Sequence, residues 1–410
     1  AFQSEPSAQF MKRSIWTGQS IYWNPYSAAG SLGPETLVDI KTSPLSIAVA
    51  LLGGSDLVFH LVFLGLNFLG VFCLLVLFAV ELRLSLLAAV AGGVTYLLNG
   101  YNVANLASNF SQTWFYFPVL VLALVTFARR PSALSFIGTT AGAVLILATT
   151  FLPTTLMVFG GSLFVGLAAA FAAAHAAIPH WGAAVAAALR NACGQICAAA
   201  LALLVLAALY LPIVEALRYL NTGDFYAGRL FHVANLFNLI SMFTPKHAFE
   251  SYSAITDRAA ELAGNVAFHQ GIVGALIVSQ AVRAWPPFQR VLLVAIGAAF
   301  LLLAARVYGV PGFAQLFSSL PVVRSIGQQY VWAGVSMLFT LLVPFGMQAL
   351  LRGGPRKAAL GCVAAVIVCA LIYTALVYRL GFAGFTHVMF AGFLIGAGSL
   401  LVLALRRPAL

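Results

Sequence analysis

The chain has 410 residues, of which 62% are hydrophobic and only 8% carry a formal charge, and its mean hydropathy is +0.99. Soluble domains carry about 25% charged residues, so this composition excludes a soluble globular protein and predicts a polytopic membrane protein. The formal net charge of +11 does not predict nucleic-acid binding, because the cations are scattered along the chain rather than gathered into one patch.

The N-terminal segment, residues 1–55, is too polar and too rich in turns to cross a membrane. Its stretch 18–45 offers Trp23 and Tyr26 for stacking and Asn24 for hydrogen bonding. Prolines and glycines exclude a long helix here. A loop of this length is usually functional or disordered, and its aromatic content argues against disorder. We therefore expect it to cover a binding site.

Eleven runs are long and apolar enough to cross the bilayer. They cover residues 56–80, 84–99, 113–128, 132–151, 153–174, 191–212, 268–282, 290–308, 328–351, 357–378 and 384–405. A further apolar piece at 44–53 is too short to span, so we expect an interfacial or re-entrant helix there, ended by Gly53 and Gly54. The predicted fold class is all-α.

Four regions follow from these spans. After the loop of 1–55 comes an N-terminal transmembrane bundle at 56–212, then a second extracytoplasmic loop at 213–267 and a C-terminal transmembrane bundle at 268–410. An odd number of spans behind an outer N-terminal loop implies one further helix upstream of Ala1. A polytopic bacterial protein ordinarily begins in the cytoplasm.

Arginines and lysines fall on every second boundary between spans, and short connections rich in cations lie in the cytoplasm. The cations concerned are Arg83, Arg129, Arg130, Arg190, Arg283, Arg290, Arg352, Arg356, Lys357, Arg406 and Arg407. This orientation places nine of the ten carboxylates outside and only Glu81 inside. We therefore expect any carboxylate chemistry on the extracytoplasmic face of a bacterial cytoplasmic (inner) membrane.

Carboxamides recur every three or four residues within 99–118, among them Asn99, Asn102, Asn105 and Gln112. On a helix they share a face, which would have to meet a polar cavity or other polar groups because unpaired amides at membrane depth are costly. The alternative is a solvated loop followed by an aromatic interface belt, Trp114 to Phe117. The pattern alone favours neither.

Two outer segments carry cations that suit an anionic ligand. Lys246 and His247 lie in the loop 213–267, where they suit a charged headgroup or a plain solvated surface. Arg324 precedes a span that begins at Gln328, so it suits either a phosphate clamp or snorkelling to lipid headgroups.

No metal site is predicted. The five cysteines lie in apolar stretches without zinc-ligand spacing, and we expect them to be buried. His175 and His180 flank a turn at Pro179 and are interpreted as membrane-interface residues rather than metal ligands.

The chain resembles the YfhO-type branch of the GT-C superfamily, integral membrane glycosyltransferases that use polyprenyl-phosphate-linked sugars. The resemblance covers most of the chain. It rests on GQSIYWNPYSAAGSLGP at 18–34, SPLSIAVALLG at 43–53, WFYFPVLVLAL at 114–124, MFTPKHAF at 242–249 and LPVVRSIGQQYVWAGVSMLFTLLVPFGMQALL at 320–351.

The resemblance implies that a sugar moves from a polyprenyl-phosphate donor to a glycan or lipid acceptor on the outer face, with a carboxylate as base on the acceptor hydroxyl. Arginine or lysine, or a divalent cation such as Mg²⁺ or Mn²⁺, would stabilise the phosphate charge. The candidate substrate-binding residues are Trp23, Asn24, Tyr26, Asn102, Asn105, Lys246, His247, Arg324 and Gln328. The candidate catalytic acids are Glu5, Glu35 and Asp39.

One departure from the family concerns the catalytic aspartate, which the family places in the first outer loop. No Asp precedes Trp23, and Glu5 is the only acid before the motif. The aspartate lies upstream of Ala1, has been lost, or is replaced by Glu5. Glu35 or Asp39 is expected within hydrogen-bond reach of the sugar. The alternative is that Trp23 and Tyr26 anchor the segment at the membrane interface and the acids are solvated.

Two other functions fit the same sequence. A transporter or flippase of a lipid-linked substrate predicts charged residues inside spans, and apart from His60, Arg306 and His387 the spans are nearly free of them. A non-catalytic GT-C-like assembly subunit would keep the fold without the acid. The sequence names no protein partner; the expected partners are membrane lipid, donor and acceptor.

The topology is testable by cysteine labelling. Arg129 and Arg130 sit on a very short connection, where the cation bias is most reliable. An impermeant thiol reagent added from outside should label a cysteine at Ser108 and not one at Ser132. The reverse pattern would invert the topology.

Overall fold

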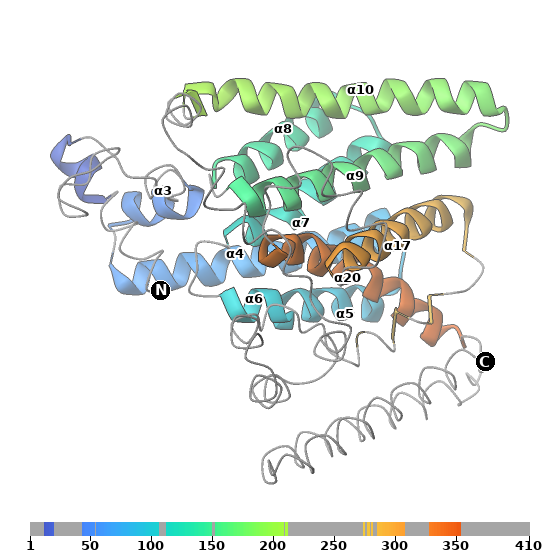
Figure 1. The fold of residues 1–410 in the computed structure, drawn as a ribbon, viewed down its shortest axis with the longest axis horizontal. Helices are drawn as coiled ribbons and strands as arrows, with labels where there is room; N and C mark the ends of the chain where they lie inside the picture. Colours follow the sequence, from blue (N-terminus) through green and yellow to red (C-terminus); the bar gives the residue numbers. More distant parts are fainter. Residues whose placement is uncertain are drawn as a thin grey trace, which may run out of the picture.

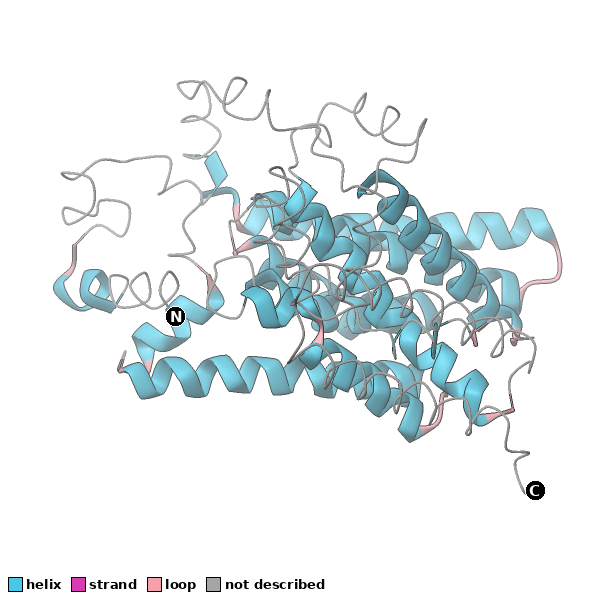
Figure 2. Ribbon diagram, turned by 60° about the horizontal axis from the view of Figure 1, so that its bottom comes forward, coloured by secondary structure: helices cyan, strands magenta, loops and turns pink. Residues whose placement is uncertain are grey.

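A computed structural model describes residues 12–19, 43–53, 55–105, 112–149, 152–208, 210–211, 285–307 and 328–353, together with Gly274, Ile277, Val278, Gln280 and Ala281. All regular secondary structure in these residues is helical (Figure 2). Seven of the described helices are long and apolar enough to cross a membrane. The chain is therefore a helical, multi-pass membrane protein, as predicted, while the total of eleven spans stays a prediction.

Figure 1 labels the α-helices. They are α3 (Pro44–Leu51), α4 (Asp56–Val76), α5 (Leu86–Leu98), α6 (Gly100–Asn105), α7 (Gln112–Arg129), α8 (Ala133–Leu147), α9 (Leu152–Ala177), α10 (Trp181–Val205), α17 (Pro287–Val307) and α20 (Gln328–Leu351). A π-helix, η2 (Leu77–Glu81), continues α4. Serines cap several of them. Ser43, Ser55 and Ser85 each accept a hydrogen bond from a backbone N–H three residues on, which satisfies a donor that the first helical turn leaves free.

Most predicted spans in the described part coincide with helices. The span 328–351 has the bounds of α20, and the short apolar piece at 44–53 forms α3. Gly53 follows α3 with a φ of +96°, a backbone conformation that glycine adopts without strain. The predicted spans at 357–378 and 384–405 lie outside the described residues.

The predicted start of the sixth span is wrong. The sequence pattern predicts a start at residue 191, with Arg190 at the boundary between two spans. In the structure α10 begins at Trp181 and runs through that arginine. The uncharged, alanine-rich stretch before Arg190 favours helix throughout. An exposed arginine on a helix surface can extend along it to reach water, so it does not have to end a span.

The prediction that the cysteines are buried is wrong for two of the three that the structure describes. Cys73 is buried, but Cys193 and Cys197 lie on the exposed face of α10. This helix is at the periphery of the bundle (Figure 1), where only 22% of its span is buried. An apolar side chain on such a face is covered by lipid, so hydrophobicity alone does not distinguish it from one in the protein core.

The bundle has two opposite ends, and successive long helices from α4 to α10 begin at alternate ends. At one end Glu81 lies beside Arg129, and Gln289 donates a hydrogen bond to the carbonyl of Leu82. We call it the arginine end, because it holds Arg83, Arg129, Arg130, Arg290 and Arg352. At the opposite threonine end, hydroxyls meet in the pairs Thr113–Thr154 and Thr149–Thr155.

These contacts confirm that predicted cytoplasmic arginines share one end, although the side of the membrane that this end faces stays a prediction. The chain leaves α10 at the threonine end and enters α17 at the arginine end. Between them, Gly274 and Ile277 lie against Phe339 and Gly346 of α20. The described part of the predicted span 268–282 thus runs along α20 toward the arginine end.

The central helix is α20, whose span is 89% buried. Small residues let its neighbours approach closely. A Cβ atom on Gly92 of α5 would lie 2.6 Å from Cγ of Pro344, and one on Gly142 of α8 would lie 3.0 Å from Cα of Leu120. Such close contact is how helices pack in lipid, where no hydrophobic force drives them together.

Glu81 and the turn that follows it connect three helices of the bundle at the arginine end. Its Oε2 lies 3.0 Å from Nη1 of Arg129, which also donates to the backbone carbonyl of Glu81. The Arg129 guanidinium lies 5.5 Å from the ring centroid of Phe288 on α17. From α20, Oε1 of Gln348 accepts from the Ser85 N–H at 2.7 Å. The turn after η2 is thus tied to α7, α17 and α20.

We expect Glu81→Gln to destabilise the protein by about 3 kcal/mol, because removing one partner leaves the Arg129 charge uncompensated. The readout is the midpoint of thermal unfolding in detergent. Arg130→Gln is the matched control, because Arg130 is 63% exposed and its Nη2 lies 3.9 Å from Glu81, a geometry worth less than about 1 kcal/mol. Equal shifts for the two variants would contradict the central role of the Glu81–Arg129 pair.

Candidate functional site

The structure describes the side chain of Asn102 alone among the predicted site residues. Asn105 ends α6 and Gln328 begins α20, but their side chains fall outside the described part. The others lie wholly outside it: Glu5, Trp23, Asn24, Tyr26, Glu35, Asp39, Lys246, His247 and Arg324. Their roles stay predictions, and the site is built from the residues that surround the threonine end.

Three helices begin at the threonine end. Oγ1 of Thr113 lies 3.3 Å from Oγ1 of Thr154, which brings the first turns of α7 and α9 together. Further along, Ser162 of α9 donates to Sδ of Met337 on α20 at 3.5 Å, so α9 and α20 run in the same direction. The positive dipole ends of α7, α9 and α20 therefore point the same way, a geometry that favours an anion.

Asn102 closes the end of α5. Its Nδ2 donates to the carbonyls of Leu97 at 3.2 Å and Tyr96 at 3.4 Å, two of the last carbonyls of that helix, and to Oδ1 of Asn67 at 3.4 Å. Helix ends leave such carbonyls unpaired, so this contact stabilises the break between α5 and α6. The Oδ1 atom of Asn102 is buried and has no hydrogen-bond partner among the described residues.

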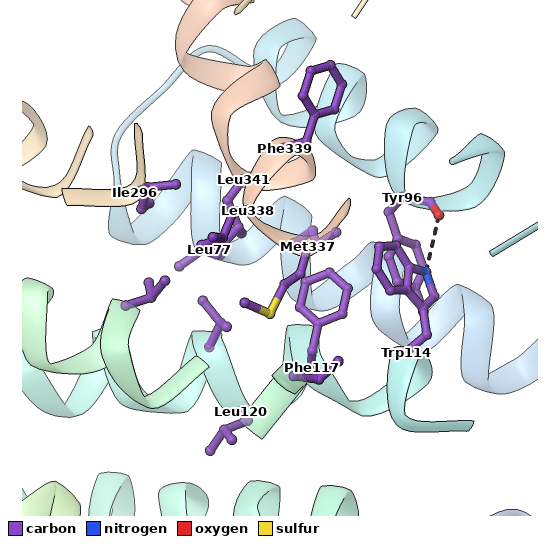
Figure 3. Packing of buried hydrophobic residues seen from close by; sticks show 14 of the residues in the cluster. Leu77, Tyr96, Trp114, Phe117, Leu120, Ile296, Met337, Leu338, Phe339 and Leu341 are labelled. Carbon is purple, nitrogen blue, oxygen red and sulfur yellow. Dashed lines mark hydrogen bonds between the residues drawn. The ribbon is translucent and has the colours of Figure 1, made fainter. Parts of the chain in front are cut away.

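The aromatic run after this turn is buried. Trp114, Phe115, Tyr116 and Phe117 are each at most 1% exposed, so the interface-belt alternative for them is wrong. Trp114 stacks on Tyr96 with centroids 5.7 Å apart and donates from Nε1 to the carbonyl of that tyrosine (Figure 3). A proline and apolar residues follow on α7. The other helices cover them, because α7 is a central helix whose span is 72% buried.

Gln112, the first residue of α7, is fully buried, and neither Oε1 nor Nε2 has a hydrogen-bond partner in the described ranges. A buried amide without partners costs about 1–3 kcal/mol. Asn99 and Asn102 are likewise buried, which contradicts a solvated loop for these three residues, and both asparagines bond polar groups of the protein. A buried polar group that the protein leaves unsatisfied is what a ligand or an ordered water would complete.

Arg306 is the residue that sequence reasoning missed as part of a site. It lies in the last turn of α17 and is only 7% exposed. One turn earlier, Leu303 packs against Gly334 of α20, so the α17 C-terminus lies beside the start of α20. The available signal was a single cation in the apolar span at residues 290–308, since ionisable residues inside spans mark functional sites.

The described residues do not hold the catalytic acid or a metal centre. Glu81 is the only carboxylate whose side chain is described, and it lies at the opposite end. No group of three His, Cys, Asp or Glu side chains in the described ranges has a metal-binding arrangement. The carboxylates of the segment 1–55 thus remain the candidates for base chemistry.

Comparisons with protein-family models, curated proteins and solved structures find no match for this chain.

Replacing Gln112 with methionine should raise thermal stability, because it removes an unsatisfied amide at similar volume. It should also weaken binding of a polyprenyl-phosphate ligand, measured by the ligand-induced shift in the unfolding midpoint.

Gln195→Met is the matched control. Gln195 is also fully buried, but its Nε2 donates to the carbonyls of Gly166 at 3.1 Å and Leu124 at 3.3 Å. Its loss should cost about 1 kcal/mol. If Gln112→Met proves as destabilising as the control, the amide of Gln112 has partners within the protein and is not waiting for a ligand.

Proposed function

We propose that this protein is an integral membrane glycosyltransferase. It moves a sugar from a polyprenyl-phosphate donor to a glycan or lipid acceptor on the extracytoplasmic face of the bacterial cytoplasmic membrane. The proposal rests on the resemblance to the YfhO-type branch of the GT-C superfamily and on the threonine end. The single observation that carries it is that α7, α9 and α20 all begin at the threonine end, where the buried Arg306 also lies.

This arrangement suits a lipid phosphate. The N-termini of the three helices supply partial positive charge, and Arg306 supplies a full one. Helix ends lie near the boundary of the hydrocarbon core, which is also the depth of a phosphate attached to a polyprenyl chain. An anionic headgroup whose tail runs between helices would therefore meet these groups without leaving the bilayer.

The chemistry would be a single displacement with inversion. A carboxylate of the segment 1–55, for which Glu35 and Asp39 are candidates, would take the proton from the acceptor hydroxyl. The acceptor oxygen would bond to the anomeric carbon as the bond from that carbon to the phosphate oxygen breaks. Polyprenyl phosphate would leave with the negative charge, which Arg306 and Arg324 would stabilise. A divalent cation such as Mg²⁺ or Mn²⁺ is the alternative source of this stabilisation.

The decisive experiment uses the full-length protein in nanodiscs with a polyprenyl-phosphate hexose whose sugar is radiolabelled. Transfer of label to a hydrophilic or lipid acceptor, with release of polyprenyl phosphate, is the expected result. Arg306→Lys and Arg324→Lys should each lower turnover about tenfold or more, because lysine loses the bidentate fork that arginine offers a phosphate.

Arg83→Lys is the control, because Arg83 is exposed and lies at the opposite end of the bundle. A transporter or flippase would move the intact donor across the bilayer without breaking the glycosyl bond. Translocation without hydrolysis or transfer, together with full donor binding in Arg306→Lys, would replace the glycosyltransferase proposal.

A further inference from the structure

The α9–α10 hairpin extends beyond the end of α7 at the arginine end. Gln195 bonds the carbonyls of Leu124 and Gly166, so these three residues lie at one level. From that level α7 continues for five residues to Arg129, whereas α9 continues for eleven to Ala177. At 1.5 Å per residue, the hairpin projects roughly 9 Å past the end of α7. Figure 1 shows α9 and α10 joined at the edge of the molecule.

Three rings close the tip of this hairpin. His175 lies parallel to Phe171, with centroids 6.0 Å apart, and Trp181 meets both rings edge-on at 6.1 Å and 5.7 Å. Trp181 is nevertheless 63% exposed, and His175 and His180 are exposed as well. The ring contacts hold the indole and one imidazole in place at the surface, where their N–H groups are accessible.

The described residues place no carboxylate at the tip. Between Glu81 and Glu215 the sequence contains none, and Glu81 pairs with Arg129 at the end of α7. Arg190 is exposed on α10 but lies nine residues past Trp181, next to Asn191, which bonds the Ala128 carbonyl at the end of α7. Exposed N–H donors without a described carboxylate beside them suit an anionic layer.

The length of the hairpin fits such a layer. The 26 residues of α9 correspond to about 39 Å of helix. The hydrocarbon core is about 30 Å thick and the bilayer with headgroups about 40–45 Å. With the threonine end at one boundary of the core, α9 and α10 reach through the opposite headgroup layer, whereas α7, with 18 residues or about 27 Å, ends near the core boundary.

We infer that the tip of the α9–α10 hairpin is a binding site for the headgroups of anionic phospholipids. Trp181 lies among the headgroups, and His175 and His180 donate N–H groups to phosphate oxygens. This lipid is a structural ligand of the arginine end, and the inference does not depend on the glycosyltransferase proposal. The amphipathic indole suits this depth, since tryptophan is enriched at membrane interfaces.

Tryptophan quenching tests where the tip lies. The full-length protein in nanodiscs is compared with Trp181→Phe, using lipid brominated either near the headgroup or near the end of the acyl chain. The headgroup-proximal bromine should quench the wild type more strongly than it quenches Trp181→Phe. The control Trp285→Phe removes a tryptophan at the same end that is only 4% exposed. It should leave unchanged the loss of emission that the headgroup-proximal bromine causes.

Lipid retention tests the chemistry. The protein is purified from nanodiscs of phosphatidylglycerol and phosphatidylcholine, and retained lipid is counted by native mass spectrometry. The double variant His175→Gln/His180→Gln should lower preferential retention of phosphatidylglycerol about fivefold. His60→Gln, an exposed histidine near the start of α4, is the control.

Each of the two experiments can overturn the inference. If Trp181→Phe leaves quenching by the headgroup-proximal bromine unchanged, the tip lies outside the membrane and its exposed rings belong to a protein contact. If the wild type retains both lipids equally, or the double histidine variant retains as much phosphatidylglycerol as the wild type, the tip does not select anionic headgroups.

Discussion

Polar groups inside this bundle have to find their partners within the protein, because the surrounding hydrocarbon offers none. Carboxamides meet this constraint at the helix contacts. Asn191 donates to the carbonyl of Ala128 at 2.8 Å, and Gln195 bridges α7 and α9. At the arginine end, Gln289 and Gln348 bond the turn that follows η2. These few bonds fix which helices are neighbours, and close packing at glycines does the rest.

The two ends of the bundle satisfy the constraint in different ways. The arginine end is closed by complementary charge, with Glu81 held by Arg129 and the guanidinium of Arg129 lying over Phe288. The threonine end is closed by paired hydroxyls and keeps unsatisfied atoms, notably both amide atoms of Gln112 and Oδ1 of Asn102. An incompletely satisfied end is better suited to receive a polar ligand than one whose charges are already neutralised by an ion pair.

Much of the architecture could be predicted from sequence, because apolar length and cation placement follow directly from the properties of a bilayer. The bounds of α20 and the short helix α3 are examples. The start of α10 could not be predicted in this way, since an arginine inside a helix and one at its end read alike. Nor could the burial of Trp114, because a stacked core and an interface belt use the same aromatic residues. The proposed site is similar: Asn102 was expected from its spacing, whereas Arg306 becomes a candidate only once α17 is seen beside α20.

The π-helix at Leu77–Glu81 links the backbone of α4 to the ion pair. The Leu82 N–H bonds the carbonyl of Leu77, five residues back rather than four, so this turn holds one residue more than an α-helix would. One residue corresponds to about 100° of helix rotation. The insertion of a single codon here during evolution would have turned Glu81 toward α7 in one step and left the preceding residues undisturbed. Relatives that lack the extra residue should then also lack the pairing of a carboxylate at this position with an arginine at the end of the helix that corresponds to α7.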